Sequence, residues 1–297
     1  MSKKIKTATI FRIGLKDDEV PVEKNLSKKY SYVEYDTFGN VVLEEKYDEE
    51  GMVEEKYVYK YDDQGKLIEE LTYLTEDEIV GHKTFDRDEN GEITKAYVHY
   101  HDGSYDTEKY TYNAAGKLLE KITIDTDGEY ESKETSIYEN DRIIKREEYD
   151  GDELILEETF EYDDDGNLAG HTKWSVQEDQ INYVNSFDGK GNVIKSLKYN
   201  NLDQLIGKTT YTYNDQGKIA QITEEMPHTT ATTKIIYDTW GNAIQQTETN
   251  ENGLVNNHVE RKYNENNQTI ESKVTINFHG TRIDQKYLLK YEYEYFD

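Results

Sequence analysis

Histidine and clustered carboxylates are the residues of this chain that could serve metal binding or catalysis. Seven histidines are present, and His99 and His101 would share one face of a strand, as two ligands of a metal ion could. No third ligand follows at a matching spacing. Asp86-Arg-Asp-Glu-Asn-Gly91 begins like a calcium-binding loop, but Tyr97 stands where the bidentate glutamate of such a loop belongs. We therefore expect no metal site.

Other catalytic chemistry has little support in the sequence. The chain has no cysteine, so thiolate nucleophiles and zinc–cysteine sites are excluded. It also has no G-x-S-x-G, P-loop or H-E-x-x-H motif. With 63 acidic residues, nearby carboxylate pairs arise by coincidence. We expect no catalytic residues, no cofactor and no enzymatic activity.

A repeated unit organises the chain. The pattern Y-x-Y-D-x-x-G-N/K, followed by two apolar residues, recurs ten times with turn positions 24 to 26 residues apart. Asp141 and Asn267 fill the glycine position in two copies. The predicted structural turn glycines are Gly39, Gly65, Gly91, Gly116, Gly166, Gly191, Gly217 and Gly241. Spacing of this regularity indicates a repeat protein.

Each unit predicts two strands and two turns. An Asp or Asn three residues before the glycine, such as Asp62 or Asn113, can accept backbone N–H bonds, and the glycine then closes the hairpin loop in a left-handed conformation. Apolar and aromatic residues alternate with polar ones on either side. A looser turn follows half a period later, for example at Gly51 and Gly128. These features predict an all-β fold: a repetitive antiparallel β-hairpin meander or spiral of about ten 25-residue units and about twenty strands, forming a solenoid-like sheet.

Three segments are expected. Residues 1–29 would form an N-terminal cap or a degenerate repeat, residues 30–279 the hairpin repeats, and residues 280–297 a C-terminal capping strand. The last segment alternates Tyr with Glu, and these glutamates would discourage aggregation at a free sheet edge.

Composition limits the class of partner. The net charge is −28, which repels phosphate backbones and disfavours nucleic-acid binding, while it permits a basic protein partner. The 27 tyrosines argue against disorder.

The turns resemble those of the YD-repeat (Rhs-like) family. Tyr35-Asp-Thr-Phe-Gly-Asn40 and Tyr162-Asp-Asp-Asp-Gly-Asn167 show the hallmark, and the resemblance covers roughly residues 30–272. The chain is also similar, more distantly, to MORN-like hairpin repeats. Large YD-repeat proteins curl a spiral of strands into a shell around a toxic C-terminal domain. This chain is too short to enclose a domain and has no Asp-Pro cleavage motif, so the resemblance implies the hairpin fold and an association with bacterial toxins.

We therefore expect a non-enzymatic protein-binding repeat scaffold, an immunity-like or chaperone-like partner of a bacterial toxin or secretion system. Two alternatives stay open. One is a carbohydrate-binding surface protein that stacks sugars on exposed Tyr or Trp. The other is an oligomeric shell component related to toxin-enclosing YD-repeat cages. A basic protein could dock on acidic residues that follow the turns, namely Glu44, Glu45, Glu54, Glu55, Glu69 and Glu70.

The N-terminus suggests the location. Met1 to Lys6 is basic, but Arg12 interrupts the apolar stretch that a secretory signal would need. No 18-residue apolar run follows anywhere, so no membrane-spanning helix is predicted. We expect a cytoplasmic protein, or an exported one if a natural signal was removed.

Overall fold

The chain folds into β-strands joined by turns. The computed structural model describes residues 3–15, 27–280 and 283–297, and these ranges contain 22 strands. Within these ranges, no helix has the length and apolar character needed to cross a membrane. In chain order the strands are β1 (Ile5–Gly14), β2 (Lys28–Tyr35), β3 (Val41–Tyr47), β4 (Val53–Tyr61), β5 (Leu67–Tyr73), β6 (Ile79–Arg87), β7 (Ile93–His99), β8 (Tyr105–Tyr112), β9 (Leu118–Ile124), β10 (Tyr130–Glu139), β11 (Arg142–Asp150), β12 (Glu153–Tyr162), β13 (Leu168–Ser175), β14 (Ile181–Phe187), β15 (Val193–Tyr199), β16 (Leu205–Tyr213), β17 (Ile219–Met226), β18 (Thr229–Tyr237), β19 (Ala243–Asn250), β20 (Val255–Tyr263), β21 (Thr269–Ile276) and β22 (Gln285–Tyr295).

The strand pairing confirms the all-β antiparallel meander. It also shows that the last strand, which was expected to be free, is paired. Successive strands pair antiparallel from β1 to β5, from β6 to β16 and from β18 to β22, and all 22 belong to one sheet. Strand β1 pairs with β2 on one side and with β22 on the other, which places Thr7 opposite both Glu34 and Glu294. The first and last strands of the chain therefore pair with each other, which corrects the ends of the solenoid-like sheet expected from the repeats. The Tyr-Glu strand β22, expected at a free edge, has a partner on each side.

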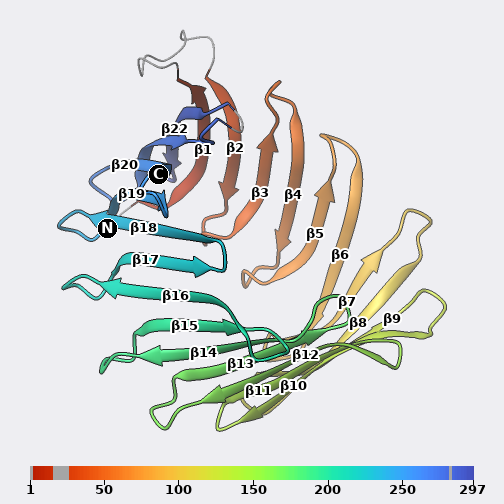
Figure 1. The fold of residues 1–297 in the computed structure, drawn as a ribbon. Helices are drawn as coiled ribbons and strands as arrows, with labels where there is room; N and C mark the ends of the chain where they lie inside the picture. The colour runs from red at the N-terminus through yellow and green to blue at the C-terminus, as the bar shows by residue number, and fades with distance from the viewer. Residues whose placement is uncertain (1–2, 16–26, 281–282) are drawn as a thin grey trace. The chain divides into compact units, whose positions relative to one another are not determined.

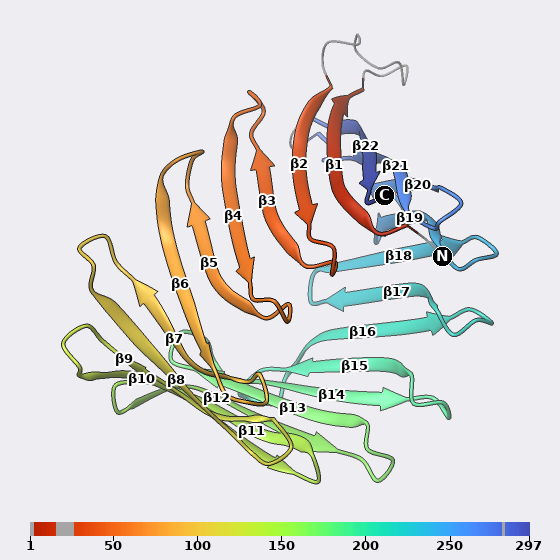
Figure 2. The same cartoon turned by 180° about the vertical axis from the view of Figure 1, so that it is seen from behind.

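The chain divides into two compact units, each described here on its own. Unit 1 comprises residues 1–82, 213–222 and 230–297, and unit 2 comprises residues 83–212 and 223–229. In unit 1, β2 to β5 are successive neighbours and β22 lies beside β1 (Figure 1). The same neighbours are seen from behind (Figure 2). In unit 2, β7 to β16 form one continuous antiparallel run.

The Asp or Asn at the start of each turn organises the hairpin. One carboxylate oxygen of Asp188 accepts the backbone N–H groups of Lys190 and Asn192 at 2.8 and 2.9 Å, and the other accepts the Asn192 side chain at 2.9 Å. The Asn192 side chain and these backbone groups lower the pKa of Asp188. Gly191 follows with φ of +81°, a conformation that glycine adopts without strain. All eight predicted turn glycines have φ between 74° and 95°, while Asp141 and Asn267 have 64° and 59°.

The tyrosine of each repeat connects one hairpin to the preceding one. Its hydroxyl donates to the backbone carbonyl two residues after the glycine position of the preceding repeat turn. Five tyrosines do this at 2.8 to 3.0 Å: Tyr61, Tyr162, Tyr237, Tyr263 and Tyr293. Phe187 occupies the tyrosine position in one repeat and cannot donate. There Asn185 donates its side-chain amide to the corresponding carbonyl, that of Leu168, at 2.9 Å.

A row of side chains of alternating charge runs across the strands of unit 2. These side chains occupy the place that an apolar core has in a thicker protein. Among the described residues, Ile13 and Ala96 are the only buried hydrophobic side chains. Glu108 on β8 is 8% exposed and contacts Lys83 and Lys121 at 2.5 and 3.3 Å. From Lys121 the row continues through Glu134, Arg146, Glu158 and His171. Each cross-strand pair of this kind contributes about 0.2–1 kcal/mol, so stability accumulates from strand to strand.

Candidate functional site

A cavity in unit 1 lies where the first and last strands of the chain meet. Its volume is about 690 Å³, within the usual range for ligand sites. Strands β1, β2 and β22 contribute to its walls, together with the end of β3, the following turn and Glu54 of β4. Its basic and aromatic lining consists of Arg12, Lys28, Lys29, Lys286, Tyr30, Tyr47 and Tyr287.

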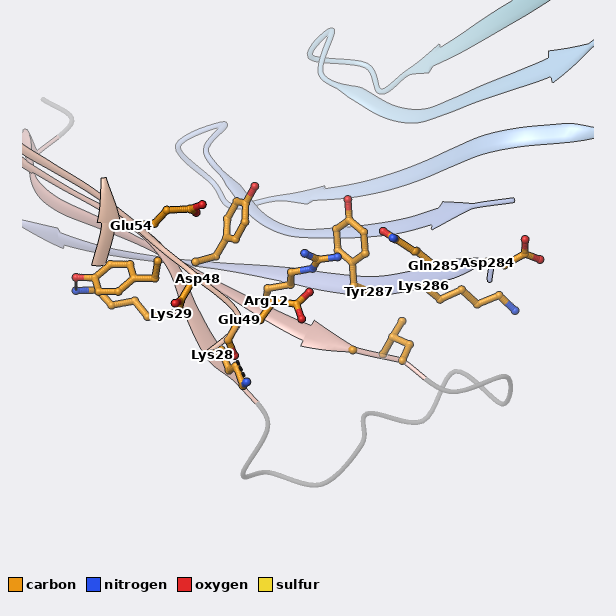
Figure 3. Close-up of a pocket in the computed structure, with 14 residues that line it drawn as sticks. Arg12, Lys28, Lys29, Asp48, Glu49, Glu54, Asp284, Gln285, Lys286 and Tyr287 are labelled. Carbon is orange, nitrogen blue, oxygen red and sulfur yellow. Dashed lines mark hydrogen bonds between the residues drawn. The ribbon is translucent and has the colours of Figure 1, made fainter. Parts of the chain in front are cut away.

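Arg12 is held against an aromatic ring. The β1–β22 register places Gly14 opposite Tyr287, so Arg12, two residues earlier on the same face, reaches the Tyr287 ring. The guanidinium carbon lies 4.2 Å from the ring centroid, and Figure 3 shows the two side chains together at the middle of the site. Among the residues that the structure describes, no carboxylate forms an ion pair with Arg12. Within the described ranges, the N–H donors of Arg12 therefore have no carboxylate acceptor.

Lys28 brings a second positive charge beside Arg12. The two residues are directly opposite each other in the β1–β2 register, and like charges in such a pair destabilise a sheet. The Lys28 ammonium donates to the backbone carbonyl of Glu49 (Figure 3). No carboxylate within the described part of the chain forms an ion pair with it. Arg12 and Lys28 thus form a local positive site in a protein of net charge −28.

Lys29, by contrast, has its partners within the wall of the cavity. Its ammonium donates to the Tyr47 hydroxyl at 2.6 Å and lies 3.8 Å from a Glu45 oxygen. Burial lowers the pKa of Lys29, and the Glu45 carboxylate partly offsets this effect. Burial and a hydrogen bond to Glu45 raise the pKa of Tyr47. This group therefore builds the wall and is less available to a ligand.

The acidic residues of the lining fall into two kinds. Asp48 accepts the backbone N–H groups of Glu50 and Met52, both at 2.8 Å, and these groups lower the pKa of Asp48. Asp284 accepts the backbone N–H of Phe278 at 2.8 Å. The side chains of Glu49 and Glu54 make no hydrogen bond or ion pair to the described residues. Considering the described residues alone, the cavity therefore holds charged side chains of both signs that form no ion pair.

The six glutamates predicted as a docking surface for a basic protein lie on both faces of the sheet. By register, Glu44, Glu55 and Glu70 share one face, while Glu45, Glu54 and Glu69 share the other. Lysines compensate three of the six: Lys29 lies near Glu45, Lys46 pairs with Glu55 at 2.6 Å, and Lys60 pairs with Glu69 at 2.5 Å. One of the six, Glu54, lines the cavity.

The histidine and turn motifs have local partners. His99 lies 2.8 Å from the Thr84 hydroxyl and packs edge-on against Tyr105. In the calcium-like motif, Asp88 accepts the backbone N–H groups of Asn90 and Glu92, both at 2.9 Å, as any turn aspartate of this fold does. The described residues contain no group of three or more His, Cys, Asp or Glu side chains placed to hold a metal ion.

The aromatic residues differ in exposure. Trp174 is half-buried, whereas Phe38 and Trp240 are 67% and 77% exposed at the tips of two turns. Tyr73 and Tyr149 each lie under a lysine ammonium, at 4.7 and 4.6 Å.

Sequence reasoning did not identify Arg12, Lys28 or Tyr287 as a site. Arg12 is noticeable as the charge inside an otherwise apolar segment. Its partner Tyr287 lies at the far end of the chain, and the repeat pattern gives no signal for the pairing of β1 with β22.

Comparisons with known proteins show a distant likeness in fold. No protein-family model and no curated protein matches the chain. A chain in the structure of a Photorhabdus luminescens Tc holotoxin pore matches 97% of this chain with 12% identity and a TM-score of 0.44, and this chain spans 17% of that one. A porin-like protein from Bacteroides uniformis matches with 8% identity and a TM-score of 0.36, and one from Bacteroides vulgatus with 9% and 0.24. Each of these two matches covers 99% of both chains.

The expected cytoplasmic location is contradicted. The antiparallel strands expose large apolar side chains, including Ile68, Ile137 and Val184 at 40%, 47% and 46%. Exposed apolar side chains on antiparallel strands are also a feature of outer-membrane β-barrels, so the sequence argument for the cytoplasm does not hold. The sequence argument failed because it looked for a continuous apolar run, whereas a strand presents apolar residues to one side at every second position.

Proposed function

We propose that this chain is a non-enzymatic, protein-binding β-repeat protein whose partner docks in the unit 1 cavity. The observation that carries the proposal is the pairing of accessible aromatic and guanidinium groups there. Tyr30 is 46% exposed, and Arg12 is stacked on Tyr287 with no described ion-pair partner. Tyrosine and arginine are among the residues that contribute most binding energy at protein interfaces.

The kind of partner follows from the repeat chemistry and the charge. The resemblance of the turns to YD repeats supports a partner from a bacterial toxin or secretion system, toward which this chain would act as an immunity-like or chaperone-like protein. A net charge of −28 favours a partner that is basic overall, and salt would slow its association. The shell-component alternative has less support, because β1 and β22 pair with each other and leave neither terminal strand free for another copy.

Carbohydrate binding is the second candidate. Phe38 and Trp240 occupy the same position of the repeat, directly before a turn glycine, and both rings are largely exposed. Exposed rings of this kind can stack on sugars. Quenching or a shift of tryptophan fluorescence by soluble glycans, abolished by Trp240→Phe, would support this function.

Affinity capture from a detergent-solubilised lysate of the native host tests the proposed function. The bait proteins are the unchanged chain, Arg12→Ala and Tyr30→Ala, with Trp240→Ala as the control for an exposed aromatic outside the cavity. We expect a defined partner that the unchanged chain and Trp240→Ala retain and that both cavity variants lose, while thermal unfolding shows that all four are folded. Equal retention by the cavity variants would place the docking site elsewhere and contradict the proposal.

A further inference from the structure

We infer that the unit 1 cavity recognises a peptide segment of mixed charge, which places a carboxylate between Arg12 and Lys28 and a basic side chain near Glu49 and Glu54. This inference rests on the proposed function and specifies the chemistry of the docked segment.

The carboxylate position follows from the β1–β2 register. Arg12 and Lys28 are opposite each other, and neither forms an ion pair with a carboxylate of the described residues, although the charge of Lys28 helps to lower the pKa of Asp48. A ligand carboxylate between them removes the repulsion of the like charges. The planar guanidinium can offer two parallel N–H groups to a carboxylate, and the stacking on Tyr287 at 4.2 Å limits the orientations of that plane. Lys28 adds a point charge on the neighbouring strand.

The basic position follows from the two uncommitted glutamates. Asp48 and Asp284 are engaged with backbone N–H groups, but the carboxylates of Glu49 and Glu54 have no partner among the described residues. Figure 3 shows Glu49 beside Lys28, and Glu54 at the end of the site away from Asp284. A lysine or arginine of the ligand would meet negative charge there.

A uniformly charged polymer fits the cavity less well than such a segment. Four carboxylates line the cavity alongside the basic residues, so a densely sulfated or phosphorylated chain would meet repulsion inside the site. The net charge of −28 would also oppose its approach. A segment that carries both signs avoids both costs.

Fluorescence anisotropy with a labelled peptide tests the inference on the full chain. The probe is a short glycine-rich peptide with one glutamate and one lysine separated by a single residue, and its counterparts replace the glutamate or the lysine with glutamine. We expect each counterpart to bind at least about tenfold more weakly. Arg12→Gln and Lys28→Gln should weaken binding of the mixed peptide by a similar factor. Arg12→Gln should also abolish the preference for glutamate over glutamine, which a purely structural role would leave intact.

The control variant is Lys60→Gln, because Lys60 of unit 1 pairs with Glu69 and does not line the cavity. It should bind like the unchanged chain. Absence of binding at millimolar mixed peptide, or equal binding of the glutamine counterpart, would overturn the inference. So would a heparin oligosaccharide that binds more tightly than the peptide and requires Arg12. If host-partner capture still depended on Arg12 and Tyr30, the proposed function would survive any of these results.

Discussion

Replacing the repeat tyrosine with phenylalanine isolates the hydrogen bond that ties one hairpin to the preceding one. In Tyr237→Phe the ring remains and the hydroxyl, which donates to the Ile219 carbonyl at 2.8 Å, is lost. The bond is partly buried, so we expect the free energy of unfolding to fall by about 1 kcal/mol. Urea titration followed by tryptophan fluorescence measures this change, because the substitution leaves both tryptophans in place.

The repeat with Phe187 supplies a matched test of the same reasoning. There Asn185 makes the bond, to the Leu168 carbonyl at 2.9 Å. Asn185→Ala should cost about 1 kcal/mol, and adding Phe187→Tyr should recover most of the loss, because the new hydroxyl can reach the freed carbonyl. In the presence of Asn185, Phe187→Tyr should gain little. The two substitutions are therefore expected to be strongly non-additive.

Additive effects in this cycle would refute the reasoning. They would mean that Asn185 and the repeat tyrosine do not serve the same carbonyl. A Tyr237→Phe variant as stable as the unchanged chain would show, separately, that the hydroxyl exchanges its partner for water at no cost.

Three further changes test the turns and the charge row. Gly65→Val should lower the free energy of unfolding by about 1 kcal/mol or more, because φ at Gly65 is +76°. Gly189→Val is the control. It should change the melting temperature little, because Thr37 occupies the same position in another repeat. Asp188 has a lowered pKa in the folded state, so its contribution is present above its unfolded pKa of about 3.9 and is lost as the pH falls through the lower folded value. Asp188→Asn should therefore lose less stability than the unchanged chain on acidification below about pH 4, and parallel pH–stability curves would contradict this. Glu108→Gln should cost about 2 kcal/mol in urea unfolding, because it removes the carboxylate partner of Lys83 and one of the two carboxylate partners of Lys121. Glu271→Gln removes a pair with the exposed Lys262 and should cost less than about 1 kcal/mol.

Sequence patterns predicted the local structure well because the turn chemistry is complete within each repeat. Where Asp starts the turn in the order Asp-x-x-Gly-Asn, as at Asp36 and Asp238, the Asn side chain donates to the second carboxylate oxygen. Where Asn starts the turn, as at Asn113 and Asn214, that oxygen is replaced by an amide and the fifth position is lysine. The backbone bonds are the same in both cases. Each turn can therefore be recognised from five consecutive residues.

The closure of the sheet could not be predicted in the same way. Strand β1 carries no copy of the repeat turn, and its pairing with β22 joins the two ends of the chain. A period in the sequence specifies how each unit meets the next, but it carries no information on whether the last unit returns to the first. Curvature and twist per strand decide that question, and they depend on all the units together.

The candidate site lies where the repeat pattern is interrupted, at the pairing of β1 with β22. Within the repeats, the basic residue after the turn lies over the tyrosine of the next unit, as Lys117 does over Tyr138, Arg142 over Tyr162 and Lys218 over Tyr237, at 5.4 to 5.5 Å. In these three repeats, the next unit thus supplies an aromatic ring for the positive charge. At the junction of β1 and β22, a strand without the repeat turn meets the final strand, and Arg12 stacks on Tyr287 while standing opposite Lys28. Departures from an otherwise consistent local pattern are where function is expected, and here the departure places two positive charges opposite each other in an acidic protein.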